Sequence, residues 1–186
     1  MKTTFAPQLR HVLLMACLFV TCHGQAQTLA SDAHDWQPCP NALADDNAPP
    51  PARDSQWDLT LSPYAYHWHY SPEHRPVFLG SVDRRVNGNR FCGLALFRNS
   101  FGQPSAYVYV GQQWDALMGD PKWFAKITGG MIYGYKGQYK EKIPFNNYGI
   151  APAIIPSVGY NLSHEDSLQV MVLGTAGVLF AYGHSF

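Results

Sequence analysis

The chain is 186 residues long and carries 13 basic and 13 acidic side chains, so its formal charge at neutral pH is zero. This length suits one domain, and the neutral balance provides no basic surface for a polyanion. We therefore expect no nucleic-acid partner.

The N-terminal stretch, residues 1–26, has the layout of a secretory signal peptide. Two basic residues stand near its start, residues 12–21 form an apolar core, and small residues precede Gln27. We expect cleavage after Ala26. A lipoprotein-type box ending at Cys17 is the alternative interpretation, but the apolar run before it is short for that purpose.

Residues 27–55 are polar and rich in proline, which favours an extended segment with little burial. Cleavage would leave two cysteines, Cys39 and Cys92. An exported chain permits a disulfide between them, but the sequence does not place Cys39, so the pairing stays open.

From residue 56 to 186 the chain is rich in aromatic residues, valine and glycine, in short runs separated by turn residues, which is the pattern of antiparallel strands. No stretch has the unbroken apolar length of a membrane helix. Asn87-Gly88 favours a tight hairpin turn. An even number of strands suits a closed up-and-down barrel. We expect strands at about 57–68, 77–86, 90–98, 105–113, 122–134, 148–160, 167–174 and 177–186.

The last predicted strand distinguishes between kinds of barrel. One face carries large, mostly apolar side chains and the other small ones, and a transmembrane barrel turns the large set to lipid. A chain that ends in Phe after such alternation resembles the terminal assembly signal of bacterial outer-membrane proteins. We therefore predict an all-β, eight-stranded antiparallel up-and-down transmembrane β-barrel over 56–186, monomeric and in the bacterial outer membrane. A soluble sandwich or lipocalin-like barrel has the same period and is the alternative. The large face consists of Val178, Phe180, Tyr182, His184 and Phe186.

Polar residues follow alternate strands of this predicted barrel. If its N-terminus is periplasmic, the stretches "YHWHYSPEHRP", "NSFGQPS" and "YKGQYKEKIPFNNY" share the outer rim. His67 and the pair Asn99-Ser100 then meet although they are distant in the chain.

An imidazole takes a proton from a hydroxyl at neutral pH, which is the chemistry of acyl transfer. The alternative to a catalytic site is a purely structural role, in which Asn99 and Ser100 cap a turn and His67 belongs to the aromatic girdle.

Strict alternation along the first strand creates a difficulty for this site. It places His67 on the same face as Leu59 and Leu61, which should contact lipid. The hypothesis therefore requires that Pro63 disrupts the register. His69 has the same parity as His67 and is the reserve candidate; the His-x-His pair lacks an acidic or Cys partner nearby, so we expect no metal site and no cofactor.

Three motifs, "WDLTLSPYAYHW", "NSFGQPSAYVYVG" and "PAIIPSVGY", resemble the PagP family of outer-membrane lipid A palmitoyltransferases over about residues 57–186. The resemblance implies an eight-stranded barrel with an N-terminal amphipathic helix, which moves palmitate from a phospholipid donor to lipid A, the anchor of lipopolysaccharide. The family's catalytic His and Ser fall on His67 and Ser100. Asn99 stands where the family has Asp. We expect its amide oxygen to hold the imidazole and orient the pair, although an amide brings no charge to stabilise an imidazolium. The prolines at 49–51 leave little room for the expected helix.

The resemblance also implies roles for residues inside the strands. Pro63, Pro152 and Pro156 each remove a ladder donor and therefore belong at edges or gaps; in this family such seams are lateral gates for lipid tails. Gly111 falls where the family has the glycine at the floor of its acyl-measuring cavity, which implies palmitate as the transferred chain. The run Phe91–Phe97 is apolar on both faces, which suits an interior that holds a hydrocarbon chain.

Charged residues of the rim are candidate ligands for the acceptor. Lys136, Lys140 and Lys142 follow the fifth predicted strand, where they would meet lipid A phosphates, although a solvated loop explains them nearly as well. Arg75 would hold a phosphate or pair with Glu73.

Two other functions stay open at this point. A lipid A deacylase is also an eight-stranded barrel with a His-Ser site, for which His184-Ser185 is the candidate pair, but adjacent strand residues point to opposite faces. A non-catalytic barrel serving adhesion or envelope integrity is the third reading.

Overall fold

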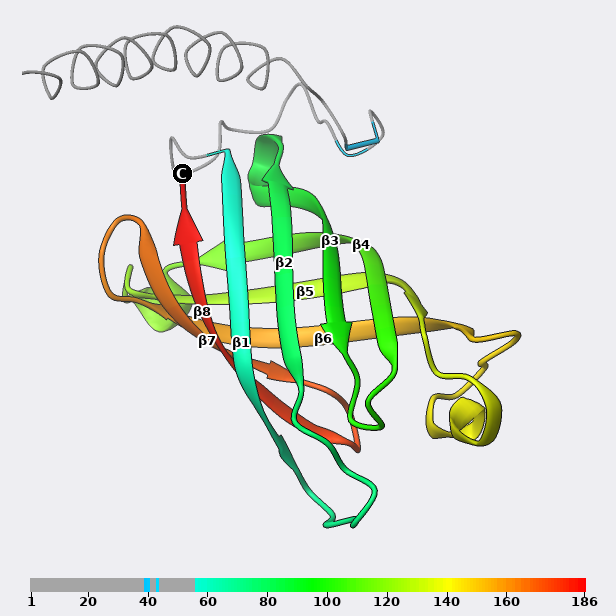
Figure 1. Ribbon diagram of the computed structural model, residues 1–186. Coiled ribbons are helices and arrows are strands. Elements are labelled where there is room, and N and C mark those ends of the chain that lie inside the picture. Colours follow the sequence, from blue (N-terminus) through cyan, green and yellow to red (C-terminus); the bar gives the residue numbers. More distant parts are fainter. Residues whose placement is uncertain (1–38, 41–42, 44–55) are drawn as a thin grey trace, which may run out of the picture. The chain divides into compact units, whose positions relative to one another are not determined.

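A computed structural model describes residues 39–40, 43 and 56–186 of the protein. The chain divides into two compact units, and Cys39–Phe186 form the unit that contains the barrel (Figure 1). The predicted signal peptide, 1–26, and most of the proline-rich segment, 27–55, lie outside the described residues.

The barrel consists of eight antiparallel strands, ordered around it as in the chain. All eight predicted runs form strands, and pairing of the first with the last closes the sheet, so the predicted up-and-down barrel is confirmed. The strands are β1 Trp57–His67, β2 Phe78–Arg85, β3 Arg90–Arg98, β4 Pro104–Asp115, β5 Trp123–Tyr133, β6 Ile150–Asn161, β7 Asp166–Val172 and β8 Gly177–Ser185.

Short 3-10 turns occupy three connections: η2 Asn87–Asn89, η3 Leu117–Gly119 and η4 Gly137–Lys142. The β2–β3 connection is longer than the two-residue turn that its Asn-Gly pair favours: Gly88 and Asn89 both have positive φ, and Val86 N–H donates to the Arg90 carbonyl at 2.8 Å. None of the described helical segments has the length and hydropathy of a membrane-spanning helix.

The two ends of the barrel differ in what they carry. Trp57 and Phe186 exchange backbone hydrogen bonds of 3.2 and 2.9 Å at one end, which we call the terminal rim. The loops after β1, β3 and β5 (68–77, 99–103 and 134–149) lie at the opposite end, the site rim. Figure 1 shows the β1–β2 and β3–β4 loops side by side there, away from the C-terminus.

The outer surface carries large apolar side chains, as a lipid-facing wall requires. In β8, Phe180 and Tyr182 are exposed whereas Ala181 is buried, and the exposed Phe186 follows the strand. The predicted alternation therefore holds for most of the strand. Val178 is the exception, because it is buried although it was placed on the exposed face.

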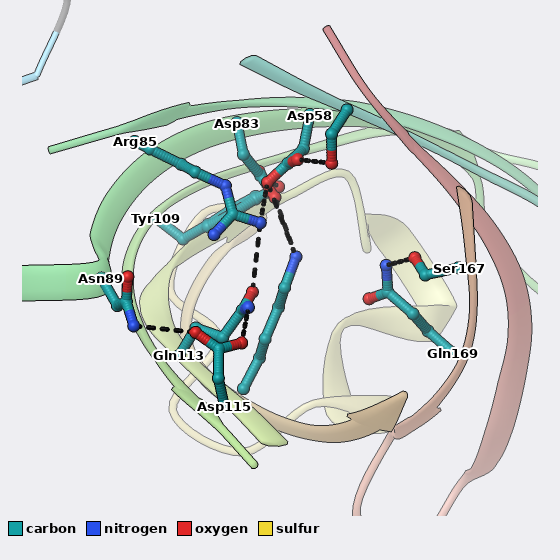
Figure 2. A network of polar contacts seen from close by, with 11 residues as sticks. Asp58, Asp83, Arg85, Asn89, Tyr109, Gln113, Asp115, Ser167 and Gln169 are labelled. Atoms are coloured by element: carbon teal, nitrogen blue, oxygen red, sulfur yellow. Dashed lines mark hydrogen bonds and ion pairs between the residues drawn. The ribbon is translucent and has the colours of Figure 1, made fainter. Parts of the chain in front are cut away.

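The half of the interior near the terminal rim is filled by a polar network (Figure 2). Arg85 forms an ion pair with Asp58 at 2.7 Å and donates to Gln113 at 3.3 Å. Lys126 lies 3.9 Å from the carboxylates of both Asp58 and Asp83. Two carboxylates thus face two cations, so each of these four charges has a partner of opposite sign.

An apolar cluster lies next to this network, toward the site rim. Its buried members are Phe91, Ala95, Tyr107 and Tyr109, and the rings of Tyr107 and Tyr109 stack with centroids 4.6 Å apart. Tyr109 joins the two layers, since its hydroxyl donates to Asp83 at 2.5 Å. The interior is therefore apolar only in part, whereas the sequence predicted an interior suited to a hydrocarbon chain. Partly buried Leu79, Phe97, Ile132, Ala153 and Ile155 pack against the cluster.

The two cysteines left open by the sequence form a disulfide. Cys39 and Cys92 are bonded with their Cα atoms 5.5 Å apart. Cys92 lies in β3, so the bond ties residue 39 to the barrel wall. Disulfides persist in oxidising compartments, which agrees with an exported protein.

Candidate functional site

The structure brings His67 and Ser100 together at the site rim. His67 ends β1, Ser100 follows β3, and His67 Nε2 lies 2.6 Å from Ser100 Oγ. This distance is that of a strong hydrogen bond. With the imidazole proton on Nδ1, Nε2 accepts the serine hydroxyl proton, which is the arrangement of a base and an activated alcohol.

A bulge at Pro63 turns the imidazole inward. Leu61 pairs with Tyr182 and Tyr64 with Phe180, so β1 gains one residue relative to β8 between these pairs. The extra residue exchanges the two faces of the strand. Beyond it Tyr64 is 56% exposed, whereas His67 is half-buried. The required disruption of register is therefore present where the sequence placed it.

Asn99 does not hold the imidazole, and that part of the prediction is corrected. Its side chain is buried, its Oδ1 accepts the backbone N–H groups of Phe101 and Gln103 at 3.0 Å each, and its Nδ2 donates to Ser105 Oγ at 3.2 Å. Asn99 thus shapes the loop that carries Ser100, as in the turn-capping alternative. It orients the dyad through the serine only.

The β1–β2 loop contacts both members of the dyad. Arg75 N–H donates to the Ser100 carbonyl at 2.7 Å, and the His74 ring lies with its centroid 4.1 Å from that of His67. Among the residues that the structure describes, no ion pair joins Arg75 to Glu73. Sequence reasoning missed His74, because a contact made across a loop leaves no periodic signal.

The lysines predicted to bind phosphate are placed unequally. The main-chain N–H and carbonyl of Lys136 form two hydrogen bonds with the Gln103 side chain in the β3–β4 loop, of 3.0 and 3.2 Å, and the Lys136 ammonium lies 4.2 Å from the centre of the Tyr133 ring. Lys142 Nζ lies 5.5 Å from the centre of the Phe101 ring. The Lys140 ammonium instead pairs with Glu141 at 3.5 Å, and both side chains are exposed. Lys136 and Lys142 therefore flank the dyad loop, and Lys140 does not.

Phe101 links the dyad loop to the β5–β6 loop. Its ring stacks on Tyr139 with centroids 4.3 Å apart and meets the edge of Tyr135 at 6.3 Å. Burial raises the pKa of the Tyr135 hydroxyl to about 12, so this group stays neutral at physiological pH. Tyr135 therefore adds no negative charge beside the lysines of this loop.

The wall opens at two seams near the site rim. The β1–β2 ladder stops at Ser62 paired with Leu79, although β1 continues to His67. The β6–β7 ladder reaches only Ser157 paired with Met171. The remainder of β6, including Pro152 and Pro156, makes no ladder with β7 in the described barrel. The predicted placement of the strand prolines at gaps is thus confirmed.

Gly111 provides no space for a substrate, which corrects the predicted acyl-measuring floor. A Cβ atom at Gly111 would lie 2.3 Å from Phe91 Cζ and 2.9 Å from the Ile127 carbonyl oxygen. The Phe91 ring is buried and fills the volume that the missing side chain leaves. The inference of palmitate from this glycine is therefore withdrawn.

The alternative His184-Ser185 pair does not form a dyad. Ser185 is buried and donates to Asp58 at 2.5 Å, whereas His184 lies on the other face with Nδ1 2.9 Å from Asp166 Oδ1. His69, the reserve candidate, is exposed beyond the end of β1. Among the described residues, no group of three or more His, Cys, Asp or Glu side chains is arranged to hold a metal ion.

Comparison with known proteins supports the fold. No protein-family model matches the sequence, and no curated protein matches it. A designed transmembrane β-barrel is similar with a TM-score of 0.54 and 13% identity, over 72% of this chain and 98% of that chain. The N-terminal β-barrel domain of Pseudomonas aeruginosa OprF gives a TM-score of 0.42 and 10% identity, over 71% of this chain and 98% of that chain. The chain has the fold of an eight-stranded transmembrane β-barrel.

Proposed function

We propose that the protein is a bacterial outer-membrane acyltransferase, which moves a long acyl chain from a phospholipid to lipid A. Palmitate is the chain transferred by the PagP family that its motifs resemble. The observation that carries the proposal is the hydrogen bond between His67 Nε2 and Ser100 Oγ, 2.6 Å long, at the rim of a transmembrane barrel. In this contact the imidazole can accept the proton of a hydroxyl, whose oxygen then attacks the carbonyl carbon of an ester.

In this proposal His67 carries the proton both in a route that acylates Ser100 and in direct transfer. In the covalent route, Ser100 Oγ loses its proton to His67 and attacks the donor ester carbonyl, and the imidazolium returns the proton to the departing lysophospholipid oxygen. A lipid A hydroxyl then attacks the acyl-serine, and its proton passes through His67 to Ser100 Oγ. In the direct route, Ser100 positions the lipid A hydroxyl, which attacks the donor ester carbonyl as His67 accepts its proton, and the imidazolium then gives that proton to the departing lysophospholipid oxygen.

The two seams support a lipid substrate. A phospholipid tail must enter the barrel from the side, because the donor lies in the bilayer. The unpaired parts of β1 and β6 interrupt the wall close to the dyad. The Lys142 ammonium lies over Phe101 of the dyad loop and the Lys136 ammonium lies over the Tyr133 ring, so both provide cations at the site rim that would contact acceptor phosphates.

Mass spectrometry of lipid A tests the proposal. We expect that expression in a Gram-negative host without this activity adds one acyl chain to lipid A. The change should disappear with His67→Ala and with Ser100→Ala, and should persist with His69→Ala, a control in the same loop region. Loss of an acyl chain would instead indicate a deacylase, and unchanged lipid A with a folded barrel would favour a non-catalytic role.

A further inference from the structure

The imidazole of His67 is fixed by few polar contacts. Its Nε2 meets Ser100 Oγ, and no hydrogen bond to Nδ1 is found among residues 56–186. Asn99 occupies the position of the family's Asp, but its side-chain oxygen accepts backbone N–H groups of its own loop. A ring held at one nitrogen can still turn about that bond, so a further contact must define its plane.

The His74 ring is placed to make this contact. The two imidazoles face each other with centroids 4.1 Å apart and planes inclined by 30°. His74 also meets the edge of Phe101, with centroids 5.8 Å apart and an angle of 65°. Phe101 follows Ser100 directly, so the His74 ring lies between the His67 imidazole and the loop that carries Ser100.

The backbone beside His74 strengthens the arrangement. His74 N–H donates to the Ser71 carbonyl at 3.1 Å, which closes a turn, and the next residue, Arg75, donates its N–H to the Ser100 carbonyl at 2.7 Å. The turn is thereby tied to Ser100 through the main chain and to His67 through the ring. A shift of the turn would move both contacts together.

We propose that His74 is a positioning residue, whose ring fixes the plane of the His67 imidazole so that Nε2 stays directed at Ser100 Oγ. This inference rests on the proposed acyl transfer and adds a residue to its site. The role needs a flat ring and no proton transfer by His74. It therefore distinguishes His74→Phe, which keeps the ring, from His74→Ala, which removes it.

Steady-state kinetics with the purified full-length protein, a defined phospholipid and lipid A test the role. Misplacement of a catalytic group by about 1 Å costs about 100-fold in rate, so we expect His74→Ala to lower kcat about 10- to 100-fold while KM for both lipids changes little. His74→Phe should recover most of kcat. His69 is exposed beyond the end of β1, so the control variant His69→Ala should match the wild type.

Two kinetic results would overturn the proposal: an unchanged kcat in His74→Ala, or a His74→Phe variant as slow as His74→Ala. Histidine 15N NMR provides a readout that does not depend on turnover. The hydrogen-bonded Nε2 signal of His67 should be lost or averaged in His74→Ala and retained in His74→Phe. If the wild type shows that signal but transfers no acyl chain, the proposed function fails while the positioning contact is still tested; the same signal in wild type and His74→Ala refutes the contact.

Discussion

The packing of Phe91 against Gly111 gives a quantitative prediction about the barrel interior. A methyl group at Gly111 would overlap the Phe91 ring, with separations of 2.3 Å from Cζ and 2.6 Å from Cε2. Overpacking of this kind costs about 1–3 kcal/mol, so Gly111→Ala should destabilise the barrel by that amount. Phe91→Ala removes a buried ring and should cost about 3–5 kcal/mol.

The double variant tests whether the two positions share one volume. Once the ring is absent, the methyl group at position 111 no longer overlaps it and only the 2.9 Å approach to the Ile127 carbonyl oxygen remains, so the cost of the methyl group should fall and the coupling should be about 0.5–3 kcal/mol. Urea unfolding in detergent micelles, followed by tryptophan fluorescence, measures all four corners of the cycle. Strict additivity, or a Gly111→Ala variant as stable as wild type, would refute the packing and restore Gly111 as the floor of an open pocket.

Three further predictions concern the site and its support. Asn99→Asp should leave kcat nearly unchanged, because the side chain does not touch His67, whereas Asn99→Ala leaves two backbone N–H groups unpaired and should destabilise the loop by about 1–3 kcal/mol for each buried orphan; kinetics and hydrogen exchange of the loop decide this. Arg85→Ala breaks a buried ion pair of 2.7 Å and should lower the free energy of unfolding by about 3–5 kcal/mol, with a much smaller loss in the variant that also replaces Asp58. Lys142→Ala should raise KM for lipid A about fivefold, the equivalent of about 1 kcal/mol, and leave kcat unchanged; an equal effect of Lys140→Ala would contradict the unequal placement of the two lysines.

The sequence was sufficient to predict the barrel because each strand has a local sequence pattern. Runs with a period of two, bounded by turn residues, located all eight strands, and up-and-down order then placed the loops after β1 and β3 at one end. Proline cannot donate to a ladder, so Pro63 marked the irregularity that turns His67 inward. The nearness of His67 and Ser100 followed from these rules.

The details that sequence reasoning missed depend on the register of neighbouring strands or on contacts between loops. Nothing local indicates that the Phe91 ring fills the space at Gly111, since the two residues belong to different strands. The His74 contact with His67 depends on how a loop folds back. Asn99 was assigned by its position before Ser100, whereas its direction is set by the backbone N–H groups that it caps.

The most direct test of the account is a balance of products from the purified, refolded barrel in detergent with one defined phospholipid and lipid A. If the dyad transfers acyl chains, lysophospholipid and lipid A with one added chain will form in equal amounts, and both will disappear in Ser100→Ala and His67→Ala variants that remain folded. A folded wild-type barrel that produces neither, or variants that produce both at the wild-type rate, would contradict the central claim.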